Sequence, residues 1–355
     1  MKVLVIIPSL LTGGGQRVAM DIAEDNPDFI FIVIGKKVDN SFTKEVESYH
    51  KVYYMNKELG FNPKVFFKIG RILKIEKPDI VHFHLGVSLY GLLPCFFRRK
   101  IKLVYTFHTI AEKDSEGIIR KLCFCGIKFR NLIPVAITET VRDSIQKMYN
   151  LSEVKMIYNG IDLSNYYCDN KKDNKKICLI AVGQIWKAKN QFFLVDVMNK
   201  LCCKENENQY ELIILGDGPL KGELENYIEK KGLSDVIELK GNVNNVHEYL
   251  AKADIFVLSS NYEGLSLATM EAMASSLPVV SLDVGGMKDL VHENGFLIPA
   301  GDIDGFAEKV KLLGINEKLR KDMGKKSLEY VKKYDKKRMR DSYLELYRSL
   351  HEVSK

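Results

Sequence analysis

Cysteine is scarce and irregularly placed in this chain of 355 residues. The seven cysteines are odd in number and none form a Cys-x-x-Cys pair, since Cys123 and Cys125 are two apart and Cys202 and Cys203 are adjacent. This pattern argues against a disulfide framework or a zinc site and favours a reducing cytosol. We expect most of the cysteines to be buried as small hydrophobic side chains.

Long apolar runs are also missing. A membrane-spanning helix needs about 18 or more apolar residues, whereas the uncharged stretch Leu85 to Phe97 contains Gly and Pro and ends at three basic residues. The opening MKVLVIIPSLL is not followed by a small-residue cleavage site of a signal peptide. The sequence therefore predicts a cytoplasmic chain that begins with a buried strand.

The dinucleotide fingerprint G-x-G-x-x-G is absent as well. The turn at Thr12-Gly13-Gly14-Gly15-Gln16 has the wrong spacing and no acidic residue placed for a ribose, which makes a nicotinamide-dependent oxidoreductase the weakest interpretation. Three glycines before a helix that is expected to begin near Arg17 still favour close approach of an anionic ligand. A merely tight turn is the alternative.

What the chain does contain is a recurrent pattern of short apolar runs between amphipathic segments. Eleven runs rich in Val, Ile and Leu are typical of strands buried on both faces, which indicates parallel sheets flanked by helices and an α/β fold. The polar segment from Ser164 to Lys176 is the best linker candidate. It separates a domain at 1–165 from one at 166–334. The segment 332–353 is predicted to form one long amphipathic helix. The C-terminal helix, at about 335–355, is expected to pack back on the first domain.

The net charge of +7 lies entirely in the first half, where residues 1–168 hold 24 Lys and Arg against 17 Asp and Glu. The basic residues stand beside large apolar ones, a mixture that favours an anionic membrane surface. The alternative is a set of solvated helix faces. Nucleic acid is a poorer explanation, because no nucleic-acid-binding module is recognised.

Ligands of open parallel sheets bind beyond the carboxyl ends of the strands, so residues at those ends are the site candidates. In the first half, His84 and His108 follow two strands, and His82 lies two positions before His84. A buried structural histidine is the alternative for each of the three, and it is strongest for His82.

In the second half, Lys187 and Lys189 precede a helix and are suited to a phosphate. A helix N-terminus near Ser266 and Leu267 is suited to a diphosphate, because its first amides lack partners. Glu263 lies before this N-terminus and Glu271 lies inside the helix.

The order and spacing of several motifs resemble the retaining glycosyltransferases of family 4, also called glycosyl transferases group 1. EGLSLATME resembles their Glu-x7-Glu motif, and the similarity extends over nearly the whole chain, through Gly13 to Gln16, PDIVHFH, TFHT, YNGID, AVGQIWKAKNQ, GDGP and LPVVSLDVGGMKDLV. The resemblance implies a GT-B fold of two facing Rossmann-like domains with a cleft between them, an N-terminal acceptor domain and a C-terminal donor domain. It also implies a hexosyltransferase that uses a nucleoside diphosphate sugar, with a UDP-sugar favoured.

The resemblance also implies roles for individual residues. Glu271 would bind the ribose hydroxyls, Glu263 the transferred sugar and Lys189 the diphosphate, while His108 would touch donor or acceptor at the reacting centre. The remaining donor-binding candidates are Gly14, Gly15, Gln16, Gln184, Gly264, Leu265, Ser266 and Leu267.

One position departs from the family pattern, because Gln184 stands where these enzymes commonly have arginine. Without that arginine, stabilisation of the leaving group is expected to be weaker by about 1.5–3 kcal/mol, the value of one charge-assisted hydrogen bond. Lys187 is a candidate to replace the missing positive charge. The one Asp-x-Asp spacing, Asp302-Ile303-Asp304, lies in a late segment. We therefore expect no cofactor and a metal-independent reaction.

The expected partners are the donor and a glycan or lipid-linked glycan acceptor for a surface polysaccharide. Peripheral contact with the inner face of the cell membrane through the first domain follows as a hypothesis. Two other functions stay open: a GT-B sugar-nucleotide epimerase, and a weakly active subunit or scaffold that holds sugar nucleotide.

Overall fold

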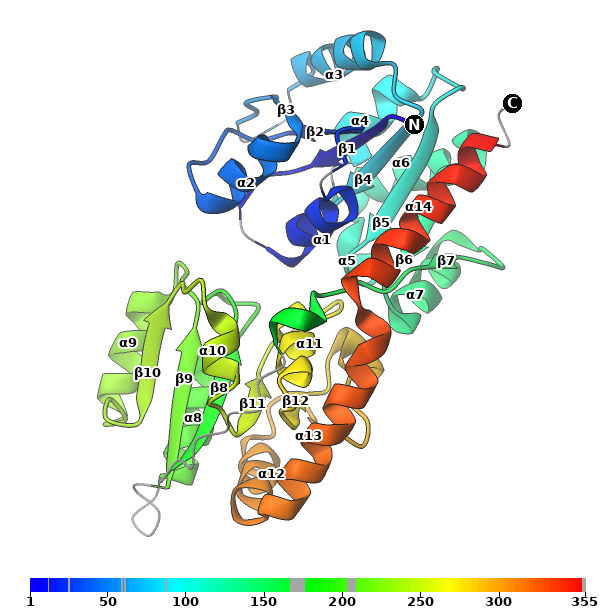
Figure 1. Cartoon of the computed structure of the whole chain (residues 1–355). Coiled ribbons are helices and arrows are strands. Elements are labelled where there is room, and N and C mark those ends of the chain that lie inside the picture. Colours follow the sequence, from blue (N-terminus) through cyan, green and yellow to red (C-terminus); the bar gives the residue numbers. More distant parts are fainter. Residues whose placement is uncertain are drawn as a thin grey trace. The chain divides into compact units, whose positions relative to one another are not determined.

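The chain forms two α/β units, each built on one parallel sheet (Figure 1). The computed structural model describes residues 1–11, 13–24, 26–58, 60, 62–86, 88–166, 176–202 and 209–352. Unit 1 comprises Met1–Gly160 and Lys336–Lys355, and unit 2 comprises Ile161–Asp335. Most of the linker candidate, 167–175, lies outside the described residues, and residues 163–165 before it form a 3-10 turn.

The sheet of unit 1 has seven strands in the order β3-β2-β1-β4-β5-β6-β7, and all neighbours are parallel. The strands are β1 (Val3–Ile7), β2 (Phe29–Val33), β3 (Lys51–Tyr54), β4 (Ile80–His84), β5 (Lys102–Phe107), β6 (Ile133–Ala136) and β7 (Lys155–Met156). The helices are α1 (Gly14–Ala23), α2 (Ser41–Tyr49), α3 (Lys64–Glu76), α4 (Ser88–Cys95), α5 (Ala111–Asp114), α6 (Gly117–Arg130), α7 (Glu139–Tyr149) and α14 (Lys336–Glu352).

The sheet of unit 2 has six strands in the order β10-β9-β8-β11-β12-β13, again all parallel. The strands are β8 (Ile177–Val182), β9 (Tyr210–Leu215), β10 (Ile237–Gly241), β11 (Ile255–Leu258), β12 (Val279–Leu282) and β13 (Gly295–Ile298). The helices are α8 (Gln191–Leu201), α9 (Lys221–Lys230), α10 (Val246–Leu250), α11 (Leu267–Ala274), α12 (Ile303–Ile315) and α13 (Glu317–Val331). Short 3-10 turns span Leu163–Asn165, Gly285–Asp289 and Lys332–Tyr334.

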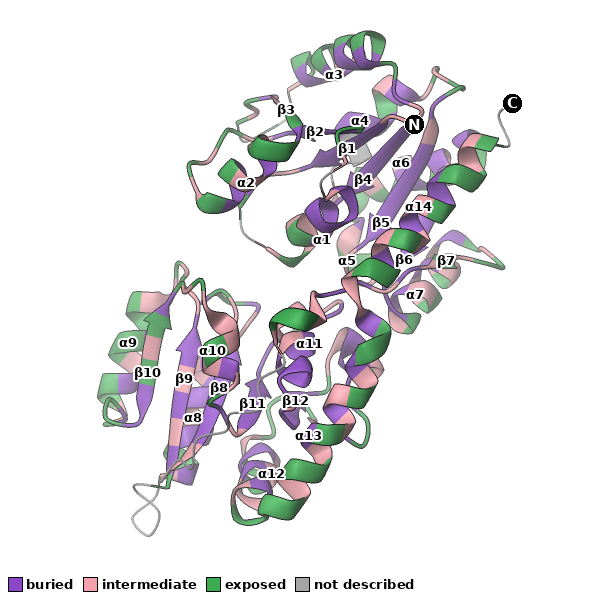
Figure 2. Ribbon diagram, in the orientation of Figure 1, coloured by how far each residue is buried: buried purple, intermediate pink, exposed green. Residues whose placement is uncertain are grey.

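The central strands form the two cores, as the continuous apolar runs predict. Every residue of β1, β2 and β4 is buried, and so is every residue of β11 and β12 (Figure 2). The edge strands are less buried: β3 has one exposed and three intermediate positions, and β10 mixes buried, intermediate and exposed positions. The predicted α/β class with parallel sheets is confirmed.

The segment at 332–353 is not one helix, which corrects the sequence prediction. Residues Lys332–Tyr334 form a 3-10 turn, Asp335 is extended, and α14 starts at Lys336. Asp335 forms a parallel bridge with Ile161, and this extended pairing is incompatible with a continuous helix. The break lets Tyr334 belong to unit 2 while α14 belongs to unit 1.

Helix α14, the red helix in Figure 1, belongs to unit 1 and contacts side chains of β4 and β5 along one face. Met339, Tyr343 and Tyr347 are buried on this face, and the Tyr347 ring lies 6.2 Å from the ring of Phe29. At its first turn, Lys336 donates to Glu24 at the end of α1. None of the helices in the described part of the chain is both long and apolar enough to cross a membrane.

Candidate active site

Each sheet has one position at which the chain order reverses. It lies between β1 and β4 in unit 1, and between β8 and β11 in unit 2. Loops that leave adjacent strands on opposite faces of the sheet open a crevice there, and open α/β sheets bind their ligands in it. Most of the predicted site residues lie in or follow these strands, whereas His108 follows the neighbouring strand β5.

The loops after β8 and β11 are joined by hydrogen bonds. Asn261 donates its backbone N–H to the Ala188 carbonyl at 2.8 Å and its side-chain amide to the Lys187 carbonyl at 2.9 Å. Ser259 donates through Oγ to the Lys189 carbonyl at 2.9 Å. These bonds hold the two loops together as one structural element, so the side chains that they carry keep fixed relative positions.

Lys189 and Glu263 form a short ion pair across these two loops. Ser260 donates a further hydrogen bond to the same carboxylate oxygen at 2.8 Å. The lysine side chain is 24% exposed and the glutamate side chain 11%. Because both groups are largely shielded from water, their attraction is stronger than that of a surface pair. The structure thus brings two of the predicted catalytic residues together.

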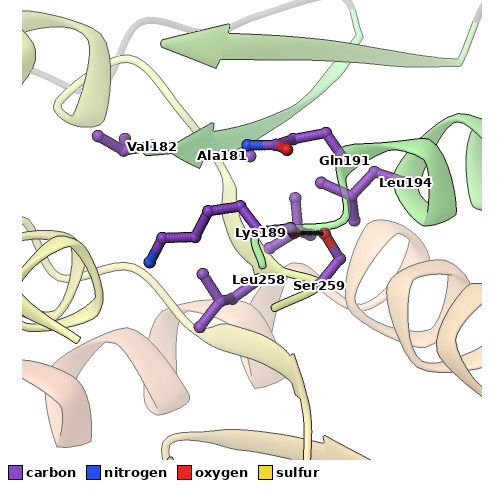
Figure 3. Close-up of a pocket in the computed structure, with 8 residues that line it drawn as sticks. Ala181, Val182, Lys189, Gln191, Leu194, Leu258 and Ser259 are labelled. Atoms are coloured by element: carbon purple, nitrogen blue, oxygen red, sulfur yellow. Dashed lines mark hydrogen bonds between the residues drawn. The ribbon is translucent and has the colours of Figure 1, made fainter. Parts of the chain in front are cut away.

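The stem of Lys189 packs beside a cavity of about 10 Å³, which is lined by the side chains drawn in Figure 3. That volume has room for about one water molecule. The cavity is therefore a packing void too small for a sugar nucleotide, and the ammonium group of Lys189 is the candidate functional group.

Helix α11 begins where the sequence predicts, at Leu267, shortly after Glu263. Ser266 is its N-cap and accepts a hydrogen bond from the Thr269 backbone N–H at 3.2 Å. The other first-turn amides provide the partial positive charge that suits an anion. Glu271 is the fifth residue of the helix and is partly exposed.

The backbone of Glu263 rests on the loop after β12. A Cβ atom added to Gly285 would lie 1.9 Å from the Glu263 carbonyl oxygen, and Gly285 has a φ of +50°. Gly286 donates its backbone N–H to that same oxygen at 3.3 Å. Only glycine permits this approach, so Gly285 sets the position of Glu263.

Gln184 and Lys187 lie in the loop after β8, and both side chains are exposed. The Gln184 carbonyl accepts a hydrogen bond from the Gln191 side chain at 3.0 Å, which fixes the loop against the start of α8. The Gln184 side chain itself remains exposed to solvent, available to a ligand.

The glycine loop of unit 1 differs from the prediction. Helix α1 starts at Gly14 rather than near Arg17, so Gly14, Gly15 and Gln16 form its first turn. Gly13 is extended and the next two glycines are helical, which means that the permissive angles of glycine are not needed here. The reason for Gly15 is packing, because an added Cβ would lie 2.7 Å from Leu85 Cδ2.

The three predicted histidines form one connected group in unit 1. His84 Nδ1 lies 2.8 Å from His108 Nε2, and His84 Nε2 lies 3.3 Å from His82 Nδ1. His82 and His84 are fully buried. Burial lowers the pKa of His82 to about 3 and that of His108 to about 4, so these imidazoles are neutral near pH 7.

Asp114 anchors the backbone of the His108 segment. Its carboxylate accepts a hydrogen bond from the His108 backbone N–H at 3.1 Å and another from the Tyr105 hydroxyl. Burial raises the pKa of Asp114 to about 6.

The Asp-x-Asp spacing at 302–304 has a structural role. Asp302 caps α12 by accepting from the Gly305 N–H at 2.8 Å, and Asp304 pairs with Lys200. Within the part of the chain that the structure describes, no cluster of three or more His, Cys, Asp and Glu side chains is arranged to hold a metal ion. Metal independence stays a prediction.

The sequence interpretation missed the partners that hold these groups. Ser260 was within the motif considered, but nothing local showed that its hydroxyl would reach Glu263. Thr106 and Tyr347 hydrogen-bond with His82, Tyr343 hydrogen-bonds with Thr106, and none of the three was predicted. Alternation along VHFH and YTFH was a usable signal for Thr106, whereas the tyrosines are more than 200 residues away.

Two family models match successive parts of the chain. Glycosyltransferase Family 4 matches residues 12–165, and Glycosyl transferases group 1 matches residues 168–330. Together they cover most of the chain.

Several relatives and solved structures are similar to this chain over nearly its whole length. UDP-Gal:alpha-D-GlcNAc-diphosphoundecaprenol alpha-1,3-galactosyltransferase of Escherichia coli is 27% identical over 95% of both chains. GalNAc-alpha-(1->4)-GalNAc-alpha-(1->3)-diNAcBac-PP-undecaprenol alpha-1,4-N-acetyl-D-galactosaminyltransferase of Campylobacter jejuni is 23% identical over 98% of both. The structure of Anabaena Alr3699/HepE in complex with UDP-glucose has a TM-score of 0.83 at 21% identity, over 98% of this chain and 100% of that one.

Proposed function

Because the chain belongs to the group 1 glycosyltransferases of family 4 and has their GT-B fold, we propose that it is a retaining transferase of a sugar from a nucleoside diphosphate sugar. The observation that carries this proposal is the Lys189–Glu263 ion pair, which stands beside the N-terminus of α11. A sugar diphosphate offers a match for each group: phosphate for the ammonium and helix amides, hydroxyls for the carboxylate.

The reaction breaks the bond between the anomeric carbon and the diphosphate oxygen and forms one from that carbon to an acceptor oxygen. The acceptor hydroxyl gives its proton to the leaving diphosphate. Lys189 and the first-turn amides of α11 stabilise the charge that develops on that leaving group. Glu263 binds hydroxyls of the transferred sugar and Glu271 those of the ribose. These groups supply the required charge without a metal ion.

The donor is a UDP-sugar and the acceptor a lipid-linked glycan under this proposal. HepE, which is similar in fold, was solved with UDP-glucose, and the Escherichia coli relative is named for a UDP-Gal donor and a diphosphoundecaprenol acceptor. We assign the chain to surface polysaccharide synthesis on the cytoplasmic face of the membrane on this basis.

The experiment is transfer of radiolabelled sugar from UDP-glucose, UDP-galactose and UDP-N-acetylglucosamine to N-acetylglucosamine-diphosphoundecaprenol, with and without EDTA. Label in the lipid with an α linkage, unaffected by EDTA, is the expected result. Loss of activity in EDTA and its recovery with manganese would refute metal independence. Formation of a different sugar nucleotide without transfer to the lipid would indicate an epimerase. Binding of the nucleotide without release of UDP would indicate a scaffold.

Peripheral membrane contact through unit 1 is part of the same proposal. Helices α3, α4 and α6 pack in series. They and the residues just after α4 expose large apolar side chains: Phe67, Ile75, Leu93, Phe97, Ile118, Phe124 and Phe129. Basic residues accompany them, among them Arg98 and Arg99. This combination is complementary to anionic headgroups above an apolar layer.

Flotation with liposomes tests that contact. We expect binding to phosphatidylglycerol vesicles at low salt, little binding to phosphatidylcholine vesicles, and loss of binding in Phe97→Ser. Ile315→Ser in unit 2 is the matched control, because Ile315 is 80% exposed and Phe97 is 89% exposed. Equal binding to both vesicle types, or an equal effect of both substitutions, would contradict the proposal.

A further inference from the structure

One face of the unit 1 sheet carries a chain of hydrogen bonds that connects α14 to His108. Strands β4 and β5 pair with His84 opposite Thr106, and side chains two positions apart point to the same face. Tyr343 and Tyr347, one helical turn apart on α14, cover this face. The members of the chain are Tyr347, His82, Thr106, Tyr343, His84 and His108.

All ionisable members of this chain are uncharged near pH 7. Burial lowers the pKa values of the three histidines, that of His84 well below 6.5, and raises the pKa of Tyr347 well above 10. A neutral imidazole has one N–H donor and one acceptor nitrogen. At each histidine, the hydrogen bond of one ring nitrogen therefore constrains that of the other, whereas a hydroxyl such as that of Thr106 can both donate and accept.

The direction is set at Tyr347. Its hydroxyl lies 2.6 Å from His82 Nδ1, and among the described residues it has no other hydrogen-bond partner. A buried hydroxyl that does not donate loses a hydrogen bond without compensation by water, so this one donates to Nδ1. The proton of His82 is consequently on Nε2, which donates to Thr106 Oγ1 at 2.8 Å.

His84 and His108 follow from that assignment. His84 Nε2 lies 3.3 Å from the acceptor nitrogen Nδ1 of His82, where two lone pairs would repel, so His84 carries its proton on Nε2. Its Nδ1 is then an acceptor, and it lies 2.8 Å from His108 Nε2. His108 must be the donor in that contact.

We propose that Tyr347 is a positioning residue for His108. Its hydroxyl acts through His82 and His84 and keeps the His108 proton on Nε2, which leaves Nδ1 as a hydrogen-bond acceptor. A helix from the end of the chain thereby determines which nitrogen His108 offers to a substrate hydroxyl. The consequence for catalysis rests on the proposed function, whereas the tautomer itself is a property of the protein without substrate.

The test is a long-range ¹H–¹⁵N correlation spectrum of the full chain labelled in its seven histidines, recorded without ligand. His108, assigned with His108→Gln, is expected as the Nε2–H tautomer in the wild type. In Tyr347→Phe the hydroxyl is lost and the ring retained. The reverse arrangement, in which His84 Nδ1 donates to His108 Nε2, is then expected to gain roughly five- to tenfold in population, as for one lost hydrogen bond.

Tyr343→Phe is the matched control, because the Tyr343 hydroxyl contacts Thr106 at 2.9 Å and no histidine. It is expected to leave the His108 tautomer unchanged. A wild-type His108 that is protonated on Nδ1 would overturn the proposal, and this measurement does not depend on the folding of a variant. A tautomer unaffected by Tyr347→Phe, or shifted equally by Tyr343→Phe, would overturn it as well.

Sugar transfer gives the second measurement. In Tyr347→Phe we expect kcat to fall roughly fivefold with KM for the donor nearly unchanged, because the hydroxyl does not touch substrate. A tautomer shift in a protein that transfers no sugar would refute the proposed function and leave the positioning role intact. Sugar transfer by a protein whose His108 tautomer does not change in Tyr347→Phe would refute the positioning role and leave the proposed function intact.

Discussion

Lys189 and Glu263, which lie 74 residues apart in the chain, form an ion pair at the carboxyl ends of the adjacent strands β8 and β11. The pair brings a cation and a carboxylate to the switch point of the unit 2 sheet. Under the proposed function, a diphosphate would compete for the ammonium and sugar hydroxyls would compete for the carboxylate. Binding of a sugar nucleotide would then replace one internal contact with two contacts to the ligand.

Lys189→Met is expected to weaken UDP binding by roughly 10- to 100-fold, because it removes one charge-assisted hydrogen bond of about 1.5–3 kcal/mol. Isothermal titration calorimetry measures the change. Lys200→Met is the control, since Lys200 pairs with Asp304 at an exposed position. Equal losses in both variants would show a general effect of charge rather than a specific contact.

Gln184→Arg is expected to raise kcat by up to roughly tenfold, because it restores the cation that the family commonly has at this position, directly after Gly183. A guanidinium stabilises the leaving diphosphate more strongly than a neutral amide does. Steady-state kinetics with a UDP-sugar measures this, and Gln184→Lys tests whether charge alone suffices. An unchanged or lower kcat in both variants would mean that another group already fills the role.

The sequence predicts the buried strands well because burial on both faces leaves a simple signature. All eleven continuous apolar runs are strands. The two missed strands, β3 and β7, are at the edges of the unit 1 sheet. Exposed side chains there, such as those of Lys51 and Lys155, interrupt the apolar pattern. The start of α1 was misplaced because glycine at 14 and 15 disfavours a helix locally, while packing against Leu85 favours it.

The candidate site was predictable only in part. Residues at strand ends, such as Lys189 and Glu263, follow from topology. Their ion pair does not, because it depends on hydrogen bonds between two loops far apart in the sequence. The contacts of Tyr347 with His82 depend in the same way on where the last helix packs.

Gly285→Ala is expected to destabilise the protein by more than 2 kcal/mol and to weaken donor binding, because the new methyl group would overlap the Glu263 carbonyl. Gly301→Ala separates the two causes, since Gly301 has a φ of +84° with no atom within 4 Å of an added Cβ. That control is expected to cost about 1 kcal/mol. Urea unfolding measures both, and equal costs would contradict the steric argument.

Glu76→Gln is expected to lower the free energy of unfolding by about 1–2 kcal/mol near pH 7. The carboxylate accepts hydrogen bonds from Lys51 at 2.7 Å and Tyr53 at 2.5 Å, and these contacts lower its pKa to about 2. A lowered folded-state pKa stabilises the fold above the ordinary value of 4.5, and this contribution is lost as the pH falls toward 2.

Denaturation of wild type and Glu76→Gln between pH 7 and pH 2.5 measures that difference. It is expected to be constant down to about pH 5 and then to shrink. Glu58→Gln is the control, because its side chain is 76% exposed. A difference that grows on acidification would refute the assignment of Glu76 as an ionised partner.

The most direct measurement is a thermal-shift panel of UDP, GDP, ADP and their sugar conjugates on wild type, Glu271→Ala and the control Glu308→Ala, whose side chain is 72% exposed on α12. A ligand at 100 times its Kd adds about 2.7 kcal/mol of stability. The account predicts stabilisation by the UDP series that is lost in Glu271→Ala and kept in Glu308→Ala. Absence of a shift with every nucleotide, or an equal shift in wild type and Glu271→Ala, would contradict it.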